Sequence, residues 1–569
     1  MIAIWLALAC GTSDTDPSID DTDVGLAPDA DDDGFRSDVD CDDTNDKVHP
    51  DAVEVCDFID NDCDQLVDGD DPDLPQQGYR DADGDKYAGT PSFTCGDTSP
   101  KVDCDDADPT IHPGAVEGEC DGIDQNCDGN GSEVALYQGV PYPSLRQAVW
   151  DAKDGTEKVV YACPGVHLEN DVIYDGFGLT IEGYTKNADD VVFDGQGGTG
   201  ILSATGDVTV KYVTFQNGGN GGRIPACLHA IGGGLEVAYA KFEGCSTAIL
   251  APGGTDTAEL HLLQVSITGG SATDGPAALA LTSDTGRIIL DGVSVTGASS
   301  DVSPVTLTIG GYGRVEINGG TFTGNRSGKS GGAVEVVTED GDPSVRIIGA
   351  TFEENVAGEA GGGFAMSMGK GAKPDLFVDS SRFLFNEAQS GGAVGIDIDR
   401  RIAGIDLWIE DSELTGNSAS QDGGAIGVYS WNGTLEDDSA EIDLTVRSVI
   451  ASKNTADRSG AVVGVGVGPG SIVVDSVFMN DNLGDVGIFV VDDGPYDVSI
   501  LDGTARRNKA GARGVFDLNL VDESNTATFK NFRFGVDTDA NTDYDVADCT
   551  SKAHLGLVNA TLTAAAPCP

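Results

Sequence analysis

The feature that most constrains the fold is a repeated pattern in the second half of the chain. An apolar residue is followed three positions later by asparagine, then by a polar turn, a glycine pair, alanine and alternating apolar residues. The clearest copy, TFTGNRSGKSGGAVEV, begins at Thr321. At steps of 26 to 37 residues, the copies bring their asparagines to Asn325, Asn355, Asn386, Asn417, Asn454, Asn482 and Asn508. A period in this range indicates a repeat architecture in which each unit buries its core against its neighbours.

Each unit contains short β-prone runs, such as residues 345–348, separated by Gly, Asn, Asp or Ser. No segment between them is long enough for a crossover helix. The sequence therefore predicts an all-β protein, a single right-handed parallel β-helix solenoid over residues 134–548. Stacked asparagine amides should hydrogen-bond along one bend, with Gly supplying unusual backbone angles and Ala packing inside. These are structural roles, because turn chemistry alone explains the spacing.

A short helix is expected at the start of the solenoid, within residues 142–154. Ser144 occupies an N-cap position, and Leu145, Ala148 and Val149 follow at helical spacing. Such a helix would cover the open end of the coil.

The chain is strongly acidic, with 96 Asp and Glu against 32 Lys and Arg and a formal net charge of −64. This balance argues against nucleic acid and anionic membrane surfaces as partners and favours cations. The sequence also lacks an apolar run of the roughly 18 residues that a membrane-spanning helix needs.

Residues 1–9 predict a signal peptide, because the apolar run IAIWLALA ends at Cys10 and a polar segment follows. The sequence Leu-Ala-Leu-Ala-Cys resembles a bacterial lipobox, which implies lipidation of Cys10 and a lipoprotein of the outer membrane or cell surface. The segment lacks a Lys or Arg before the apolar run, and Leu8 is bulkier than usual at its position. An ordinary signal peptide and a secreted protein are the alternative. Residues 10–28 would form a flexible acidic tether.

Residues 29–133 contain two copies of a segment rich in aspartate and cysteine, which predict a small loop-rich module. Carboxylates at alternate positions supply the oxygen ligands that Ca²⁺ prefers, and a backbone carbonyl follows at position 7. We expect four such loops, and Asp103 and Asp105 complete the predicted ligands. The first loop has Asp29, Asp31, Asp33, the Phe35 carbonyl and Asp40; the second has Asp60, Asp62, Asp64, the Leu66 carbonyl and Asp68; the third has Asp81, Asp83, Asp85 and the Tyr87 carbonyl; the fourth has Asp124, Asn126, Asp128 and the Asn130 carbonyl.

Apart from Cys10, twelve cysteines remain, an even number that indicates disulfides in an exported protein. The cysteines that flank the loops predict the pairs Cys56–Cys63, Cys120–Cys127 and Cys95–Cys104, and Cys549–Cys568 would close a C-terminal cap over residues 549–569. The pairing of Cys41, Cys163, Cys227 and Cys245 stays open. Oxygen-only loops disfavour zinc, and no CxxC pair occurs.

The module resembles the MopE-type metal-binding motif of exported bacterial proteins, and in style the calcium repeats of thrombospondin. The second copy carries the resemblance in DCDD at 103–106, HPGAVE at 112–117 and CDGIDQNC at 120–127. The first copy has HPDAVE at 49–54 and CDFIDNDC at 56–63. The resemblance implies bound calcium and no catalysis. Because one MopE class is associated with copper, a copper-binding surface protein is a minor alternative.

The region from about 140 to 548 resembles pectate-lyase-like β-helices and the FxxN and GGAV repeats of polymorphic outer-membrane proteins and adhesins. These motifs imply a fold more than an activity. The first hypothesis is a non-catalytic, calcium-binding surface lipoprotein that displays the solenoid for adhesion or contact with extracellular polysaccharide or a surface protein. The alternative is a β-helix enzyme, a polysaccharide lyase or glycoside hydrolase, for which Asp397 and the neighbouring Arg400 are candidates.

Overall fold

We describe the fold from a computed structural model, which defines a large part of the chain. The described residues are 28–55, 59–67, 71, 82–87, 103–115, 120–121, 123–127, 133–253, 258–369, 371–398, 404–429, 441–466, 469–494, 496–510, 515–520, 526–534, 546–548, 554–558 and 565–566. The chain divides into two compact units. The acidic module comprises residues up to 116 together with 124–131, and the solenoid comprises 117–123 and the chain from 132 onwards.

The solenoid begins with a hairpin of β1 (Ala135–Tyr137) and β2 (Val140–Tyr142), followed by helix α1 (Leu145–Asp154). The predicted helix is confirmed, and the side chain of Ser144 accepts a hydrogen bond from the backbone N–H of Gln147. The buried face of the helix, which includes Leu145 and Val149, packs against β1, β3 and β5. The carboxylate of Glu169 also accepts a bond from the N–H of Leu145 at 2.7 Å, so the first turn of the helix is capped from the sheet.

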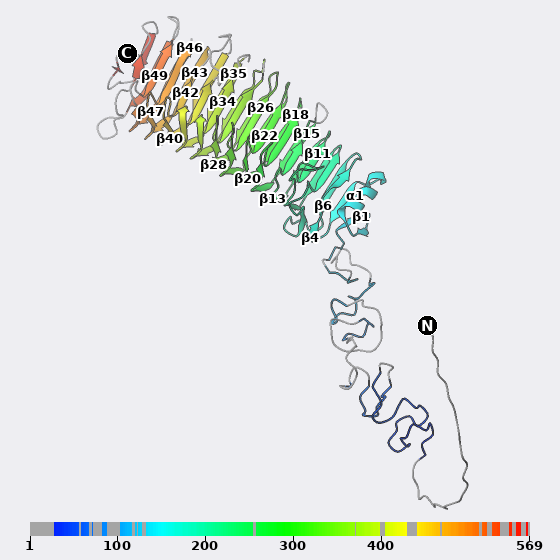
Figure 1. The fold of residues 1–569 in the computed structure, drawn as a ribbon. Coiled ribbons are helices and arrows are strands. Elements are labelled where there is room, and N and C mark those ends of the chain that lie inside the picture. Colours follow the sequence, from blue (N-terminus) through cyan, green and yellow to red (C-terminus); the bar gives the residue numbers. More distant parts are fainter. Residues whose placement is uncertain are drawn as a thin grey trace, which may run out of the picture. The chain divides into compact units, whose positions relative to one another are not determined.

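Parallel strands form four stacks along the solenoid (Figure 1), of which two run its whole length and two are present in only some of its coils. The first stack is β3 (Val159–Ala162), β6 (Leu179–Gly183), β9 (Val208–Lys211), β12 (Leu235–Ala238), β15 (Glu259–Leu263), β19 (Arg287–Asp291), β23 (Arg314–Asn318), β27 (Ser344–Ile348), β31 (Asp375–Asp379), β35 (Gly404–Glu410), β39 (Glu441–Arg447), β43 (Gly470–Asp475), β47 (Tyr496–Arg506), β50 (Thr526–Phe534) and β52 (His554–Val558). The second stack is β4 (Gly165–Leu168), β7 (Val191–Asp194), β10 (Thr214–Gln216), β13 (Lys241–Glu243), β16 (Ser266–Thr268), β20 (Ser294–Thr296), β24 (Thr321–Thr323), β28 (Thr351–Glu353), β32 (Arg382–Leu384), β36 (Glu413–Thr415), β40 (Ile450–Ser452) and β44 (Phe478–Asn480), which joins the first stack at β47.

The third stack is a narrow ribbon of nine short strands, and the fourth is a sheet of fifteen. The third stack is β17 (Ser271–Ala272), β21 (Ser299–Ser300), β25 (Arg326–Ser327), β29 (Val356–Ala357), β33 (Glu387–Ser390), β37 (Ser418–Asp422), β41 (Thr455–Ala456), β45 (Leu483–Gly484) and β48 (Lys509–Ala510). The fourth stack is β5 (Val172–Tyr174), β8 (Leu202–Thr205), β11 (Leu228–Ile231), β14 (Ile249–Ala251), β18 (Leu279–Ser283), β22 (Val305–Ile309), β26 (Val334–Thr338), β30 (Phe364–Met368), β34 (Val394–Ile398), β38 (Ile426–Tyr429), β42 (Val463–Val465), β46 (Phe489–Gly494), β49 (Phe516–Leu520), β51 (Val546–Asp548) and β53 (Ala565–Ala566).

The predicted all-β solenoid is therefore confirmed, and α1 is its one α-helix within the part of the chain that the structure describes. That part holds no helix with the length and apolar character needed to cross a membrane. Because side chains alternate across each strand, apolar residues of all the stacks meet in a continuous core. Phenylalanines repeat at one core position, where the rings of Phe322, Phe352 and Phe383 stack with centroids 4.9 and 4.7 Å apart.

The repeated asparagines form the predicted ladder at the bend between the second and third stacks. Asn386, which is fully buried, donates from Nδ2 to the Phe352 carbonyl and to Oδ1 of Asn417, both at 3.0 Å. Its own Oδ1 accepts from the backbone N–H and Nδ2 of Asn355 at 3.1 and 2.9 Å. The same pattern continues to Asn508. Each rung therefore satisfies buried polar groups of its neighbours.

The glycine pair at the next bend is required by two separate constraints. Gly361 has φ +66°, a left-handed conformation that glycine adopts without steric cost. A Cβ on Gly362 would lie 2.3 Å from the carbonyl oxygen of Gly392 in the next coil. The alanine that follows the pair is fully buried at Ala333, Ala393 and Ala425, as predicted.

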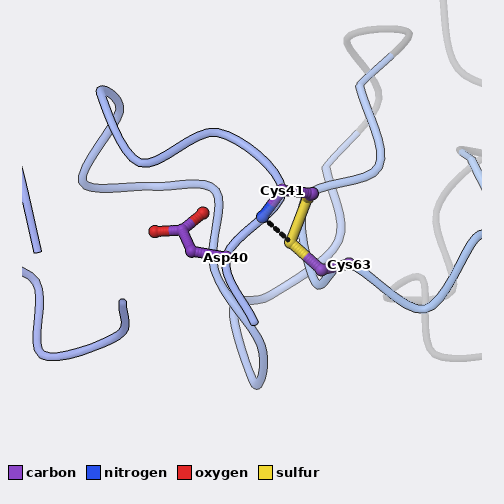
Figure 2. A group of neighbouring side chains, drawn as sticks. All are labelled: Asp40, Cys41 and Cys63. Atoms are coloured by element: carbon purple, nitrogen blue, oxygen red, sulfur yellow. Dashed lines mark hydrogen bonds between the residues drawn. A yellow bond between two sulfur atoms is a disulfide. The ribbon is translucent and has the colours of Figure 1, made fainter. Parts of the chain in front are cut away.

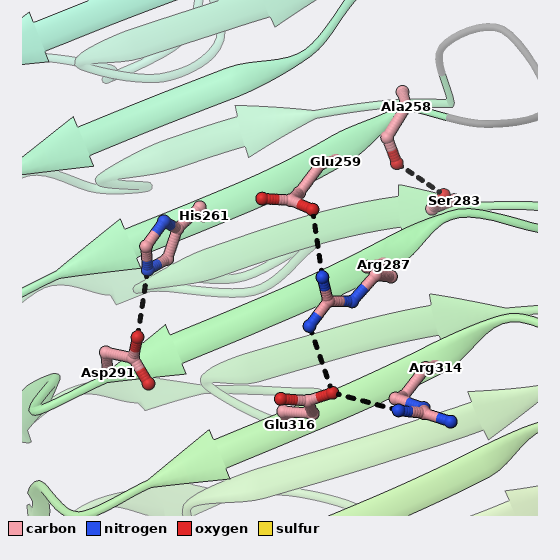
Figure 3. Close-up of polar contacts among 8 residues, drawn as sticks. All are labelled: Ala258, Glu259, His261, Ser283, Arg287, Asp291, Arg314 and Glu316. Atoms are coloured by element: carbon pink, nitrogen blue, oxygen red, sulfur yellow. Dashed lines mark hydrogen bonds and ion pairs between the residues drawn. The ribbon is translucent and has the colours of Figure 1, made fainter.

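The outer face of the first stack is charged and largely paired where β15, β19 and β23 lie side by side (Figure 3). Arg287 bridges the carboxylates of Glu259 and Glu316 at 3.3 and 3.2 Å. His261 contacts Asp291 at 3.0 Å on the same face. These exposed pairs contribute little to stability, but they keep this face of the sheet polar.

Candidate metal centre

The first acidic loop of the module directs three carboxylates to one point. Ligand oxygens of Asp29, Asp31 and Asp33 all lie within 4.8 Å of one another. The intervening residues make this possible, because Asp32 and Gly34 have φ values of +66° and +101°. The left-handed residues turn the backbone around the carboxylates at alternate positions.

Hydrogen bonds within this loop use only some of the carboxylate oxygens. Oδ1 of Asp31 accepts from the N–H of Asp33 at 3.3 Å, and Oδ1 of Asp33 accepts from the N–H of Phe35 at 2.8 Å. Asp29 accepts from the N–H groups of Asp32 and Gly34 through its two oxygens. The remaining oxygens of Asp31 and Asp33 are buried and have no hydrogen-bond donor.

Asp40, in the segment that follows this loop, is a buried acid that is only 8% exposed, and its carboxylate lies within 4.8 Å of the sulfur atoms of Cys41 and Cys63. Its Oδ1 accepts from the N–H of Asp42 at 2.8 Å, while its Oδ2 is buried without a donor. Burial, followed by the charges of neighbouring carboxylates that include Asp33 and Asp40, raises the pKa of Asp31. These oxygens need a positive charge that the surrounding protein does not supply.

The second copy of the motif repeats this arrangement. Asp103, the counterpart of Asp40, is 3% exposed and has a buried Oδ2 without a donor. Burial, then the carboxylates of Asp85, Asp83 and Asp106, raise its pKa. Gly84 and Lys86 have φ +88° and +81°, at the loop positions of Asp32 and Gly34.

An aromatic contact also recurs beside the loop in each copy. The rings of Phe35 and His49 stack with centroids 4.8 Å apart, and those of Tyr87 and His112 stack at 4.7 Å. The sequence analysis treated Phe35 and Tyr87 only as carbonyl ligands and missed this packing. Its sequence signal is an aromatic residue at position 7 and a His-Pro pair in both copies.

The second acidic loop lies beside a further group of acids, two of which, Glu54 and Asp71, were not among the predicted ligands. Asp60, Asp62 and Asp64 have ligand oxygens within 4.8 Å of one another, as predicted. Glu54 and Asp71 form another such group with Asp62, and they are 1% and 5% exposed. Glu54 ends the HPDAVE segment, which recurs as HPGAVE, and that recurrence was the available signal.

Several predicted ligands remain untested. Asp68, Asp81, Asp128 and Asn130 lie outside the described residues, as do Cys10, Cys56, Cys95, Cys549 and Cys568. Asp105, Asp124 and Asn126 are described but belong to none of the ligand groups above.

The cysteine pairing differs from the prediction. Cys63 bonds to Cys41 rather than to Cys56, and Cys104 bonds to Cys127. Therefore neither the predicted Cys95–Cys104 pair nor the predicted Cys120–Cys127 pair forms. Cys63 occupies position 4 of its loop with φ +61°, and its sulfur bonds to that of Cys41, next to Asp40 (Figure 2). The disulfide thus joins two acidic loops instead of flanking one.

Two further disulfides belong to the solenoid unit. Cys120 bonds to Cys163, directly after β3, and the two sulfur atoms lie in a small buried cluster with Leu136. Cys227 bonds to Cys245, which links consecutive coils. The sequence analysis left Cys163, Cys227 and Cys245 unassigned, because their pairing depends on the register of the coils.

The module can thus hold a cation that prefers oxygen. The cysteines nearest the carboxylates, Cys41, Cys63, Cys104 and Cys127, are oxidised and offer no thiolate. The Pro50 carbonyl raises the pKa of His49 by accepting a hydrogen bond, and the nearby carboxylates of Asp33, Asp40 and Asp31 raise it further. Carboxylate oxygen is the donor of hard cations, whereas imidazole and thiolate suit transition metals.

The fold and site define a parallel β-solenoid protein with an acidic, disulfide-linked metal-binding module. Residues 40–69 and 103–133 match the family model Cu-binding_MopE, described as "Putative metal-binding motif". The expected MopE-type motif is therefore present in two copies, ahead of the solenoid. Neither a curated protein nor a solved structure matches the chain.

Proposed function

We propose that the module binds calcium and that the chain is an exported, non-catalytic surface lipoprotein that displays its solenoid for contact with other molecules. One observation carries the calcium assignment: Asp29, Asp31 and Asp33 bring ligand oxygens within 4.8 Å of one another, and Oδ2 of Asp31 and of Asp33 is buried without a donor. A Ca²⁺ ion accepts six to eight oxygen ligands in flexible geometry, which suits loops of this kind. Millimolar calcium outside a cell is enough to occupy even weak sites.

Copper is the competing metal, because the matching family is named for it. The oxidised cysteines, which offer no thiolate, and the packing of the His49 ring against Phe35 argue against it. Magnesium is a weaker candidate, since it demands near-octahedral geometry and keeps several water ligands.

The test is hydrogen exchange of the full-length protein with and without EGTA. Calcium removal should increase exchange in residues 28–55 and 103–115 and leave the solenoid strands unchanged. Calcium should restore protection, and magnesium or copper should not. Unchanged exchange after chelation, or restoration by copper alone, would refute the calcium assignment.

A matched pair of variants assigns any effect to the site itself. Asp40→Asn removes a buried charge from the cluster and should weaken calcium binding by about tenfold or more. Asp38→Asn, at an exposed position two residues earlier, is the control and should leave binding unchanged. Equal effects of the two substitutions would show that binding reflects general acidity.

The lipid anchor rests on the LALAC sequence at residues 6–10. In a bacterial host, the wild-type protein should partition into detergent and incorporate labelled palmitate, and Cys10→Ser should abolish both. Incorporation that survives Cys10→Ser would rule out lipidation at this cysteine.

A further inference from the structure

The first coils of the solenoid expose a row of tyrosines that neither the core nor the metal module uses. Tyr161, Tyr184 and Tyr239 are 40%, 45% and 45% exposed, and Tyr212 is partly exposed. They lie on or directly after β3, β6, β9 and β12 of the first stack, so four successive coils contribute one ring each. At the spacing of parallel strands the row spans about 15 Å.

The rings contact one another in pairs along the solenoid. Tyr212 and Tyr239 stack face to face, with centroids 5.2 Å apart and planes 4° from parallel. Tyr161 and Tyr184 pack edge to face at 6.4 Å. The row therefore consists of two pairs of outward-facing amphipathic rings on successive coils, with aromatic faces and hydroxyl groups available to a partner.

Two of these tyrosines stand where the backbone disfavours them. Tyr212 and Tyr239 have φ values of +57° and +53°, in the left-handed region where bulky residues are unusual. The next coil turns the same corner with Gln264, and later coils turn it with smaller residues, all with positive φ: Gly292, Gly319, Gly349, Ser380, Asp411, Ser448 and Ser476. Folding of the corner therefore does not explain the two tyrosines, and neither does burial.

The charges beside the row are paired, although the whole chain is strongly acidic. Lys211, directly before Tyr212, contacts Glu236 at 2.9 Å, and Lys186 contacts Glu182 at 3.9 Å. In a later coil the neighbours of an aromatic residue are acidic: on β35, Asp406 lies two residues before Trp408 and Glu410 lies two residues after it. A locally balanced surface complements an uncharged ligand rather than a cationic one.

We propose that this tyrosine row binds an uncharged glycan chain. Successive sugar rings would lie along the solenoid, with their apolar faces on the aromatic rings and their hydroxyl groups bonded to the tyrosine hydroxyls and the flanking paired charges. Rigid aromatic residues supply such contact area at low cost in conformational entropy. The proposal names the partner of the displayed solenoid, so it rests on the display part of the proposed function and not on calcium.

The test is affinity electrophoresis of the full-length protein through gels that contain hydroxyethylcellulose, laminarin or mannan. Polygalacturonate serves as an anionic polymer, and poly-lysine as a cationic one. At least one uncharged glycan should retard the wild-type protein. A double variant, Tyr212→Ser with Tyr239→Ser, should weaken that binding about tenfold or more.

The serine substitutions reproduce the residue that later coils use at this corner, so the double variant should fold with an unchanged melting temperature. Tyr312→Ser is the control, because Tyr312 is 82% exposed outside the row, and it should leave binding unchanged. Absence of retardation by every uncharged glycan, retardation by poly-lysine alone, or full binding by the double variant would overturn the proposal. Binding that persists in EGTA while the module loses protection would separate this site from the calcium site.

Discussion

Removal of one rung from the asparagine ladder should destabilise the solenoid locally by an amount that can be worked from its hydrogen bonds. Asn386→Ala deletes four bonds of 2.9 to 3.1 Å, two donated by Nδ2 and two accepted by Oδ1. The backbone N–H of Asn355 loses its acceptor in a fully buried site. At a net contribution of about 1 kcal/mol for each bond, the loss is about 4 kcal/mol.

The appropriate assay is native-state hydrogen exchange, because a solenoid opens locally and a single global free energy does not describe it. A loss of about 4 kcal/mol should accelerate exchange of the Asn355 amide roughly a thousandfold, provided that global opening does not dominate. Amides around Asn508, several coils away, should change much less.

A matched control is Asn220→Ala, at an exposed residue whose Nδ2 donates to the Gly197 carbonyl at 3.1 Å. It should change exchange by less than about threefold, in line with a small effect at the surface. If Asn386→Ala accelerates exchange of the Asn355 amide by less than about tenfold, the ladder contributes little. The apolar core alone would then hold the coils together.

Three predictions concern the module. Glu54→Gln keeps an acceptor for the N–H of Asn61 but removes a buried charge. Titration calorimetry should therefore show weaker calcium binding or fewer calcium sites. Unchanged affinity and an unchanged number of sites would exclude Glu54 as a ligand. Burial raises the pKa of Asp103, so its protonation should weaken calcium binding as pH falls through that raised value. Without metal, Asp103 binds its proton more tightly in the folded module than in the unfolded chain. The free energy of unfolding of the metal-free module should therefore fall as pH rises from 3.8 through the raised pKa of Asp103. An unfolding free energy that rises over this pH range would contradict the prediction. A double serine variant of Cys41 and Cys63 loses the disulfide that links residues 22 positions apart. Denaturant titration should show that the calcium-loaded module is less stable by about 3 kcal/mol. An unchanged unfolding free energy would refute a stabilising role for the disulfide.

Much of the solenoid could be predicted because its information is local and repeated. The Asn, the Gly pair and the Ala recur in each coil, and each residue type has one physical use at its bend. The helix was equally readable, since Ser144 and the apolar spacing that follows it form a local pattern. The tyrosine row was missed because the repeat was aligned on asparagines of later coils, and Tyr212 and Tyr239 replace the expected turn residues.

The acidic loops were partly readable for the same reason. The alternation of acids along the chain identified Asp31 and Asp33. Glu54 lies outside such an alternation, and only the fold of the loop brings it to Asp62 and Asp71. The disulfides could not be read from proximity in the sequence. Cys63 pairs with Cys41, which is 22 positions away in the sequence, and not with a cysteine of its own loop.

The asparagine ladder has a direction, and this bears on how such a chain can change over evolutionary time. The backbone N–H of each Asn donates to the side chain of the next, from Asn325 to Asn508, and Ala298 holds the equivalent place in the coil before the ladder begins. Each coil within the ladder therefore presents the same donors on one side and the same acceptors on the other. If a whole coil is duplicated or deleted, the donors and acceptors of the coils that become neighbours still match. The ladder already contains successive asparagines that are 26 to 37 residues apart in the sequence. The solenoid can lengthen, shorten or acquire new surface loops by recombination within its own gene, while the ends and the metal module stay unchanged.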